Sequence, residues 1–496
     1  MDDARRIADA LMRGALPSSS GETVVYPRSR VLKGDTGILM IRRSDEVFLL
    51  AAGSGPLFDE LPGEVFDTFK LAPLIETTRR VINRHFPYTL PAPAGRLKSG
   101  IGLGDRLGLA SPGHIRAVRE RGVFPVLAQQ SMRELTLTGR TYSDVLDAAC
   151  FGVLREGYTE GFGADGDHLK NEDDISAALD AGFSMITLDC SDFIDAEIES
   201  LAPSEIKRRY ASVPVPVRKD YERTYAGKEF LVEGAEISFD KMELARCLLL
   251  YSGVIDFAEK VYRERIATAG REVDFELSID ETAAPTSPEA HYLVAAELSR
   301  RGVVLTGVAP RFCGEFQKGV DYRGDVDRFR REFAVHSAIA DAFGYRLSVH
   351  SGSDKFAVFP AIGELTKGRF HVKTAGTNWL EAVRLVAMKF PELYRRVHER
   401  ALECFDEARR YYHVSADTAV LRPLNTLSDD ELASGLDDED TRQVLHITYG
   451  FILRREPDGA MNPLGREFLS ALIAEEELYA EMLAGHIGRH LRLLGK

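Results

Sequence analysis

Residues 161–193 read GFGADGDHLKNEDDISAALDAGFSMITLDCSDF and contain one complete unit of the pattern that determines the fold. A short strand-like run passes into a polar tail of Asp, His and Lys, and a helical stretch follows. A second apolar run, SMITL, then passes into another polar tail. Alternation of strand and helix is typical of a parallel sheet, because a helix is the usual crossover between two parallel strands.

The same unit recurs along the chain from about residue 98. The segments are GIGLGDRLG (100–108), VFPVLAQQSMRE (123–134), GFGADGDHLK (161–170), SMITLDCSDF (184–193), VDFELSIDET (273–282), VVLTGVAPRF (303–312), RLSVHSGSDKF (346–356) and FHVKTAGTNW (370–379). Their apolar parts are continuous rather than alternating, as expected of strands covered on both faces. Eight units over roughly 290 residues approach the ~250 residues of a closed barrel. We therefore predict an α/β fold with a (β/α)8 TIM-type barrel over residues 96–385.

A doubly wound open sheet is the main alternative to this barrel. An open sheet concentrates functional residues at one switch point, whereas a closed ring carries them on its whole C-terminal rim. Polar residues follow nearly every candidate strand, which favours the closed ring.

Two further regions flank the predicted barrel. Residues 1–95 are predicted to form an α/β extension, in which GILMIRRSDEVFLLAA (37–52) is a β-hairpin candidate. The proline-rich stretch FPYTLPAPAGR (86–96) ends this extension, because proline interrupts both helices and sheet ladders. Residues 386–496 are predicted to be helical and to pack on the barrel.

An insertion interrupts the barrel pattern at about residues 200–240, where the sequence is charged and contains several prolines. It could be a lid or an excursion on the outside of the barrel. The apolar spacing of residues 240–270 then suits one long helix, or two helices joined at Gly253.

The composition favours a small-molecule ligand. A net charge of -14 repels phosphate backbones and anionic lipid, so we expect no nucleic-acid and no membrane partner. The five cysteines form no CxxC pair, which is typical of reduced thiols. The N-terminus lacks the apolar core of a secretion signal, and no run approaches the ~18 apolar residues of a membrane span. We therefore expect a cytoplasmic protein, and self-association into a homo-oligomer is compatible with the sequence.

Several common catalytic motifs are missing. The glycines of GIGLGDRLG lack the GxGxxG spacing of a dinucleotide-binding turn. The chain also has no GxxxxGK[ST] phosphate loop and no GxSxG nucleophile elbow. Hydride transfer, nucleotide hydrolysis and serine-hydrolase chemistry therefore lose support.

The strongest chemical signal comes from two histidines at strand ends. Asp165 and Asp167 share one face of the third strand, and His168 can turn toward the rim where the strand ends. His350 ends the seventh strand. Neutral imidazoles from separate strands can meet across a barrel mouth and bind a divalent metal, while an adjacent Asp accepts a proton. The alternatives are a Gly/Asp-rich turn with a surface histidine, and a core histidine that is bonded to a carbonyl.

Two further strands add carboxylate or amide oxygens. Glu276 lies inside the fifth strand, where an unpaired carboxylate is costly, so we expect a metal, a lysine or a catalytic role for it; a salt-bridged structural Glu is the alternative. After the sixth strand, Glu315 and Gln317 could each supply a ligand oxygen, and spacing does not separate them.

Cations also follow the barrel strands, and an acidic substrate would need them. They are Arg106, Arg133, Arg311, Lys355 and Lys373. Arginine forks suit carboxylates, although any one of these residues could equally be a solvated rim charge. Their number in a protein of net charge -14 indicates a locally positive mouth.

Five segments resemble the tagaturonate epimerase family, and the likeness covers most of the chain. They are IGLGDRLGLASPGHIRAV, PVLAQQSMRELTLTGRTY, EGFGADGDHLK, ITLDCSDFI and HVKTAGTNWLEAV. The resemblance implies interconversion of D-tagaturonate and D-fructuronate with one divalent metal, for which Zn, Mn, Ni, Co and Fe are all suitable.

The resemblance also implies roles for single residues. Asp167 would be the proton acceptor, Glu276 the proton donor, and His168 and His350 metal ligands, with Gln317 favoured over Glu315 as the third ligand. Separately from the resemblance, we predict that the substrate is bound by Asp105, Arg106, Gln129, Arg133, Arg311, Lys355 and Lys373.

The two hexuronates differ at a hydroxyl-bearing carbon β to the ketone, so simple enolisation does not labilise that C–H bond. We therefore expect metal-assisted retro-aldol cleavage, rotation of the aldehyde and re-addition. Two other functions are the alternatives: a class II aldolase or another metal-dependent ketose or sugar-acid isomerase on the same barrel, and a non-catalytic sugar-acid sensor.

Overall fold

Eight parallel strands close into a barrel, in the order β12-β13-β14-β15-β6-β7-β8-β9. The computed structural model describes residues 2–282, 284–456 and 458–496. The barrel strands are β6 (Gly100–Gly102), β7 (Phe124–Ser131), β8 (Gly163–Leu169), β9 (Met185–Asp189), β12 (Asp274–Ile279), β13 (Gly307–Pro310), β14 (Arg346–Val349) and β15 (Phe370–Lys373). Each lies within one of the predicted segments, so the predicted (β/α)8 barrel is confirmed and the open sheet is excluded.

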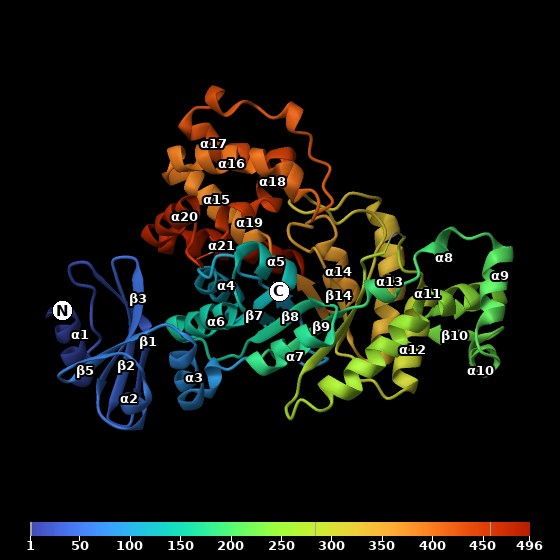
Figure 1. Cartoon of the computed structure of the whole chain (residues 1–496), viewed down its shortest axis with the longest axis horizontal. Coiled ribbons are helices and arrows are strands. Elements are labelled where there is room, and N and C mark those ends of the chain that lie inside the picture. The colour runs from blue at the N-terminus through green and yellow to red at the C-terminus, as the bar shows by residue number, and fades with distance from the viewer. Residues whose placement is uncertain (1, 283, 457) are drawn as a thin grey trace.

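Helices cover the outside of this barrel (Figure 1). They are α4 (Ser111–Val118), α5 (Met132–Thr138), α6 (Tyr142–Glu156), α7 (Glu172–Ala181), α11 (Lys241–Val261), α12 (Pro288–Arg300), α13 (Val326–Phe343), α14 (Phe359–Leu365) and α15 (Thr377–Lys389). Some of these helices begin at a side-chain cap close to the preceding strand. Asn171, for example, accepts a hydrogen bond from the N–H of Asp174, and α7 therefore starts directly after the polar tail of β8. The tails therefore stay at the barrel rim.

The N-terminal region is an antiparallel sheet at one end of the molecule (Figure 1). It contains α1 (Asp2–Met12), β1 (Thr23–Lys33), β2 (Thr36–Arg43), β3 (Glu46–Gly53), α2 (Pro56–Glu60), β4 (Glu64–Phe66) and β5 (Phe69–Pro73), and α3 (Glu76–His85) follows. The predicted hairpin is confirmed as β2 and β3, which pair up to Arg43 and Glu46 at the turn.

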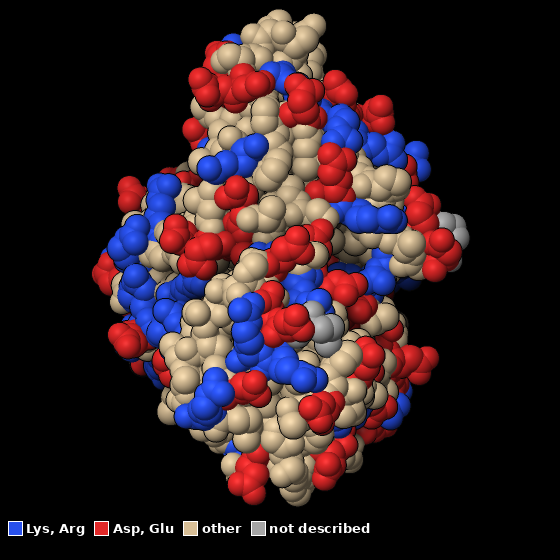
Figure 2. Space-filling model, turned by 90° about the vertical axis from the view of Figure 1, so that its left-hand side faces the viewer, with Lys and Arg blue, Asp and Glu red and all other residues tan. Residues whose placement is uncertain are grey.

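Ion pairs join this sheet to the rest of the chain. Glu476 of α21 (Glu476–Leu493) accepts from Arg42 of β2 at 3.2 Å and from Arg155 of α6 at 2.8 Å. On the face shown in Figure 2, acidic and basic side chains are interspersed, and no continuous basic surface covers it.

The insertion packs on the outside of the barrel. It consists of α9 (Pro203–Ser212), α10 (Val215–Tyr225) and the hairpin of β10 (Glu229–Val232) and β11 (Ala235–Ser238). Its strands contact α12 and α13, and buried Tyr225 donates a hydrogen bond to Glu297 of α12 at 2.7 Å. The helix that follows, α11, runs unbroken through Gly253, so the two-helix alternative is wrong.

The C-terminal region is helical, as predicted, and lies over one end of the barrel (Figure 1). It contains α16 (Pro391–Ala408), α17 (Asp429–Gly435), α18 (Glu439–Ile447), α19 (Tyr449–Leu453), α20 (Pro463–Ala474) and α21. Within the described part of the chain, no helix is both long and apolar enough to cross a bilayer.

A buried ion-pair cluster attaches α21 to the barrel. His486 of α21 lies 2.6 Å from Asp354 in the loop after β14 and 3.1 Å from Glu381 of α15. Arg442 of α18 donates to the other oxygen of Asp354 at 2.6 Å. His490 accepts from the N–H of Asp354 and bonds the carbonyl of His486 through its other nitrogen, so the cluster is internally satisfied. It ties two C-terminal helices to one barrel loop.

This cluster predicts a pH-dependent stability. Burial alone lowers the pKa of His486, but Asp354 and Glu381 outweigh it and raise the pKa to about 9. Because the folded pKa exceeds the unfolded value of ~6.5, the stabilisation is complete below about pH 6.5 and is lost as the pH rises through about 9. We expect His486→Gln to remove about 3 kcal/mol of stability at pH 6 and little at pH 10.

Thermal unfolding of both proteins between pH 6 and pH 10 checks this expectation. The control is His413→Gln, at an exposed position, which should follow the wild-type curve. A constant difference between wild type and His486→Gln across the range would contradict the assigned ion pair.

Candidate active site at the barrel mouth

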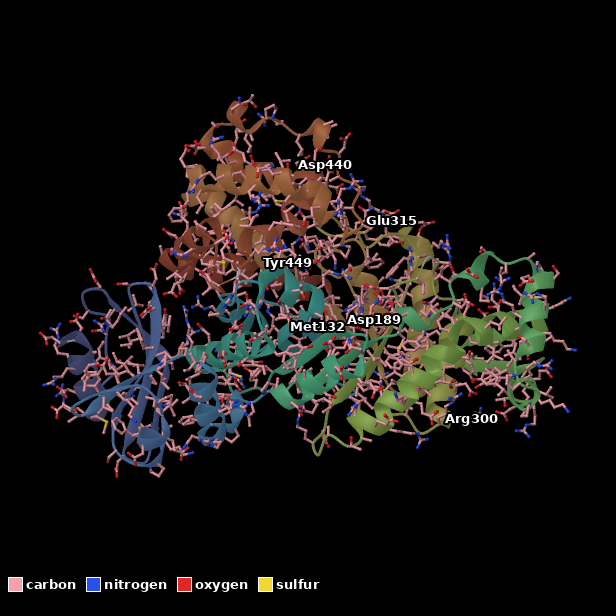
Figure 3. All side chains as sticks on the ribbon, viewed as in Figure 1. Met132, Asp189, Arg300, Glu315, Asp440 and Tyr449 are labelled. Atoms are coloured by element: carbon pink, nitrogen blue, oxygen red, sulfur yellow. The ribbon has the colours of Figure 1, made fainter. Side chains whose placement is uncertain are left out.

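A cavity of about 730 Å³ opens where the barrel meets the C-terminal helices. Residues from the loops that follow most of the barrel strands line it, and Tyr411, Tyr412, His413 and His446 complete it from the C-terminal region. Met132, Asp189 and Glu315, which Figure 3 labels in the middle of the molecule, are among the lining residues. None of the described residues of the insertion lines the cavity, so the insertion is no lid in this structure.

One lysine joins a buried cluster of acids, called the floor below, of which Asp167 and the lysine itself line the cavity. Lys373 Nζ, at the end of β15, lies 2.8 Å from Asp165 Oδ2, 2.7 Å from Asp167 Oδ1 and 3.1 Å from Glu276 Oε1. It also donates to Thr187 Oγ1 at 2.6 Å. All of these side chains are buried, and they come from β8, β9, β12 and β15. A single ammonium therefore joins four strands.

The floor sets the ionisation of its own groups. Burial alone would raise the pKa of Asp167 and of Glu276, but Lys373 outweighs it and holds both pKa values well below their usual range. Burial raises the pKa of Asp165 to about 6. Despite burial, the carboxylates raise the pKa of Lys373 well above its usual value. Asp165 and Asp167, on the same strand, thus have different pKa values. Such a difference between neighbouring acids is typical of acid–base sites.

A bulge brings two consecutive residues of β8 into the cavity. Successive strand residues normally point to opposite faces. The pairing of β8 with β9 shifts between Gly166 and Leu169, and His168 has a φ of 55°. This extra residue lets both Asp167 and His168 line the cavity, with His168 Nδ1 2.8 Å from Asp167 Oδ1.

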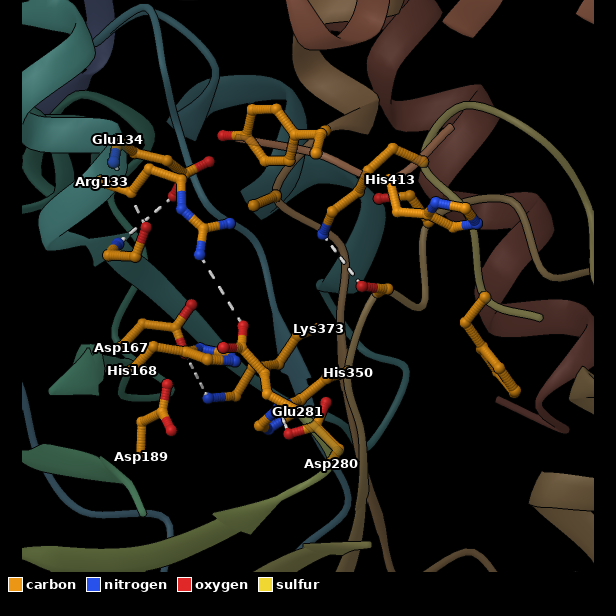
Figure 4. A pocket seen from close by; sticks show the side chains of 18 of the residues that line it. Arg133, Glu134, Asp167, His168, Asp189, Asp280, Glu281, His350, Lys373 and His413 are labelled. Atoms are coloured by element: carbon orange, nitrogen blue, oxygen red, sulfur yellow. Dashed lines mark hydrogen bonds and ion pairs between the residues drawn. The ribbon is translucent and has the colours of Figure 1, made fainter. Parts of the chain in front are cut away.

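The two predicted histidines meet. The ring centroids of His168 and His350 lie 4.7 Å apart. His350 Nε2 is 2.8 Å from Glu276 Oε1, and its Nδ1 is 3.2 Å from Asp280 Oδ1. Figure 4 shows Asp167, His168, His350 and Lys373 pointing toward one another on one side of the cavity.

These residues fit a divalent cation. One ligand atom each from His168, His350 and Asp280 lies within 4.8 Å of the others. Two imidazole nitrogens and a carboxylate oxygen are donors that Zn, Mn, Fe, Co and Ni accept. Despite burial, Asp280 and Glu276 raise the pKa of His350 to about 10, and the same negative charge would attract a metal in place of the proton.

The structure places Gln317 and Glu315 in the cavity wall with partners of their own. Gln317 Oε1 accepts from Gln443 Nε2 at 2.9 Å and from the N–H of Ser415 at 3.1 Å, and its Nε2 donates to Glu315. Asp280 was not assigned as a ligand from the sequence. Its position directly after β12, like that of His350 directly after β14, was the available signal.

The two predicted arginines Arg106 and Arg133 stand on the other side of the cavity. Arg106 is buried, stacks on Tyr449 and donates to Glu134 at 2.7 Å. Arg133 is exposed, lies over Tyr412 and is 3.8 Å from Glu281. Each guanidinium therefore already has an acidic neighbour.

The remaining predicted substrate residues have differing surroundings. Gln129 and Arg311 line the cavity, and Gln129 Nε2 donates to Asp167 at 3.1 Å. Asp105 accepts three backbone N–H groups of the loop that starts α4, and it is not among the lining residues. Lys355 reaches the cavity wall, but its ammonium donates to three backbone carbonyls.

Comparisons with known proteins identify the family of this chain. A family model described as tagaturonate epimerase matches residues 26–494. A tagaturonate/fructuronate epimerase from Thermotoga maritima is 43% identical over 416 residues, which is 84% of each chain. Two solved structures of the fructuronate-tagaturonate epimerase UxaE from Cohnella laeviribosi, one native and one in complex with glycerol, are each 53% identical, with a TM-score of 0.95 over 100% of both chains. The predicted family resemblance is confirmed, and the chain belongs to the tagaturonate epimerase family.

Proposed function

We propose that this chain interconverts D-tagaturonate and D-fructuronate. The observation that carries the proposal is its 53% identity, over the full length of both chains, to a solved structure described as a fructuronate-tagaturonate epimerase. The cluster of acids and imidazoles at the barrel mouth supports it, because inversion at a carbon β to a ketone needs both proton transfer and stabilisation of negative charge.

His168, His350 and Asp280 would hold a divalent cation, and Gln317 remains the candidate ligand from the loop after β13. When bound, such an ion acts as a Lewis acid that stabilises negative charge on an oxygen of the substrate. The neighbouring protein groups supply the remaining chemistry.

Asp167 and Glu276 would handle the proton. In a retro-aldol route, Asp167 takes the proton of the substrate hydroxyl as the carbon–carbon bond breaks. The aldehyde rotates, and re-addition leaves the oxygen on the opposite side of the carbon, where Glu276 returns a proton. Lys373 Nζ bonds both carboxylates, at 2.7 and 3.1 Å, and can accept a proton from one as it gives a proton to the other.

The first test is conversion of D-tagaturonate to D-fructuronate by protein that has been stripped with a chelator and then restored with each candidate metal. We expect turnover only after restoration. Asp167→Asn and Glu276→Gln should each lower kcat by roughly 100-fold or more, because general acid–base catalysis contributes about that much.

The matched control is Asp192→Asn, which also removes a carboxylate but at an exposed position paired with Lys170, and it should keep kcat within about 3-fold of wild type. Full turnover by Asp167→Asn would exclude Asp167 as the proton acceptor.

The route itself is tested by running the reaction in D2O. Retro-aldol cleavage leaves the hydrogen on the inverted carbon, so NMR of the product should show no deuterium there. Deuterium at that carbon would mean direct proton abstraction and would exclude retro-aldol chemistry. Accumulation of three-carbon fragments would favour the aldolase alternative.

The central role of Lys373 predicts a large cost on its removal. Lys373→Met leaves three buried carboxylates without their cation, and breaking a buried ion pair typically costs ~3–5 kcal/mol. Urea unfolding should show a loss of this size. Lys260→Met, which breaks a pair between a half-exposed lysine and Glu172, should cost less than about 1 kcal/mol.

Adding Asp165→Asn to Lys373→Met should recover part of the loss, since one buried charge is removed. An unchanged free energy of unfolding in Lys373→Met would show that the floor is not held by this ammonium.

A further inference from the structure

Lys318 differs from the other lysines that line the cavity. It lies in the loop after β13, is partly buried, and donates to Ser351 Oγ at 2.9 Å. Among the described residues no carboxylate oxygen lies within 4 Å of its ammonium. Lys373 and Lys170 have acidic partners, and Lys355 is bonded to three carbonyls. Lys318 thus has no ion-pair partner in the described part of the chain.

The backbone around Lys318 is held from several sides. Lys355 donates to the carbonyls of Gln317 and Val320, at 2.9 and 2.6 Å. From α18, Gln443 Nε2 donates to the carbonyl of Lys318 at 3.0 Å, and Arg442 Nε donates to that of Gly319 at 2.8 Å. Four successive carbonyls therefore receive side-chain donors, which fixes the position of Lys318. A cation held in this way needs little reorganisation to bind an anion.

The surroundings of Lys318 favour an anionic ligand. Arg106 also lines this cavity, so a second cation lies among the lining residues. On the same wall, His446 is 1% exposed, and neither of its ring nitrogens has a hydrogen-bond partner among the described residues. His446 lies one helical turn after Gln443 on α18. Desolvated polar groups without partners are costly, so this wall is suited to a ligand that bonds them.

The charges of the cavity also orient a sugar acid. The acids Asp167 and Glu276 lie with Lys373 on one side of the cavity, where the hydroxyl and ketone groups would react, and their charges are already paired. Lys318 is a lining lysine that has no ion-pair partner among the described residues. The hydroxyl and ketone end of a hexuronate would therefore face the floor, and its carboxylate would face Lys318. Ser351, which bonds Lys318, directly follows His350, so the two ends of the site are adjacent.

We propose that Lys318 binds the carboxylate of the hexuronate and thereby selects charged sugar acids over neutral ketohexoses. The inference rests on the proposed function for the identity of the substrate. Arg106 and Arg133 are weaker candidates, because each has an acidic neighbour: Glu134 lies 2.7 Å from Arg106, and Glu281 lies 3.8 Å from Arg133. Arg311 is the rival: it lines the cavity, and its guanidinium has no carboxylate within 4 Å among the described residues.

The experiment measures binding by calorimetry of D-tagaturonate and of D-tagatose, the neutral ketohexose with CH2OH in place of the carboxylate. Wild type should bind D-tagaturonate much more tightly than D-tagatose. Lys318→Met should weaken D-tagaturonate binding by about 30-fold or more and change D-tagatose binding by less than about 3-fold. Lys318→Arg should restore part of the affinity.

Lys207→Met is the control, since it removes one positive charge at an exposed position of α9, outside the cavity, and it should change either affinity by less than about 3-fold. Arg311→Met tests the rival assignment. The melting temperature of Lys318→Met should equal or exceed that of wild type, because a desolvated charge is removed. Equal weakening for both sugars, unchanged D-tagaturonate binding, or a loss in Arg311→Met alone would overturn the proposal.

Turnover is measured separately. If wild type binds D-tagaturonate but forms no D-fructuronate, the proposed function fails, while the binding comparison still decides the role of Lys318. If Lys318→Met raises KM and keeps kcat within about 3-fold, the lysine acts in binding rather than in the chemical step.

Discussion

The contact of one ammonium with three carboxylates inside the barrel is the constraint on which the site depends. Lys373 and Asp165 are 208 positions apart in the chain, and their 2.8 Å contact forms only when the ring of strands is closed. Buried charges are costly unless they are paired, so the closed barrel and the paired acids require each other. The acids in turn determine which face of the cavity can accept a cation.

Much of the fold could be predicted, because barrel strands leave a local signal. Segments such as SMITL (184–188) are continuously apolar, and each is followed by a polar tail and a helix. The hairpin at 37–52 was visible because two apolar runs enclose a charged turn. The insertion could not be assigned, since it packs on α12 and α13, whose residues lie far along the chain. Whether Gly253 would break a helix was equally open, because a single glycine is tolerated when neighbouring turns pack well.

A site residue could be predicted from the sequence where its position at the end of a strand is enough to place it at the barrel mouth. His168 and His350 end two strands, and the closed ring brings them together. Position alone does not reveal what a side chain bonds. Lys355 also follows a strand, yet it donates to carbonyls of a neighbouring loop. The sequence does not indicate a binding role for Lys318, because this residue lies well inside a loop. The shape of that loop depends on helix α18 from the C-terminal region.

The irregularity in β8 has a consequence for how this segment can vary. Asp167 and His168 both reach the cavity only because β8 holds one residue more than its neighbour β9 over that stretch. Deleting a residue there would restore regular alternation and turn one of the two side chains toward the surrounding helices. The length of the segment GADGDHL is thus as constrained as its composition. A substitution within it is tolerated more readily than an insertion or a deletion.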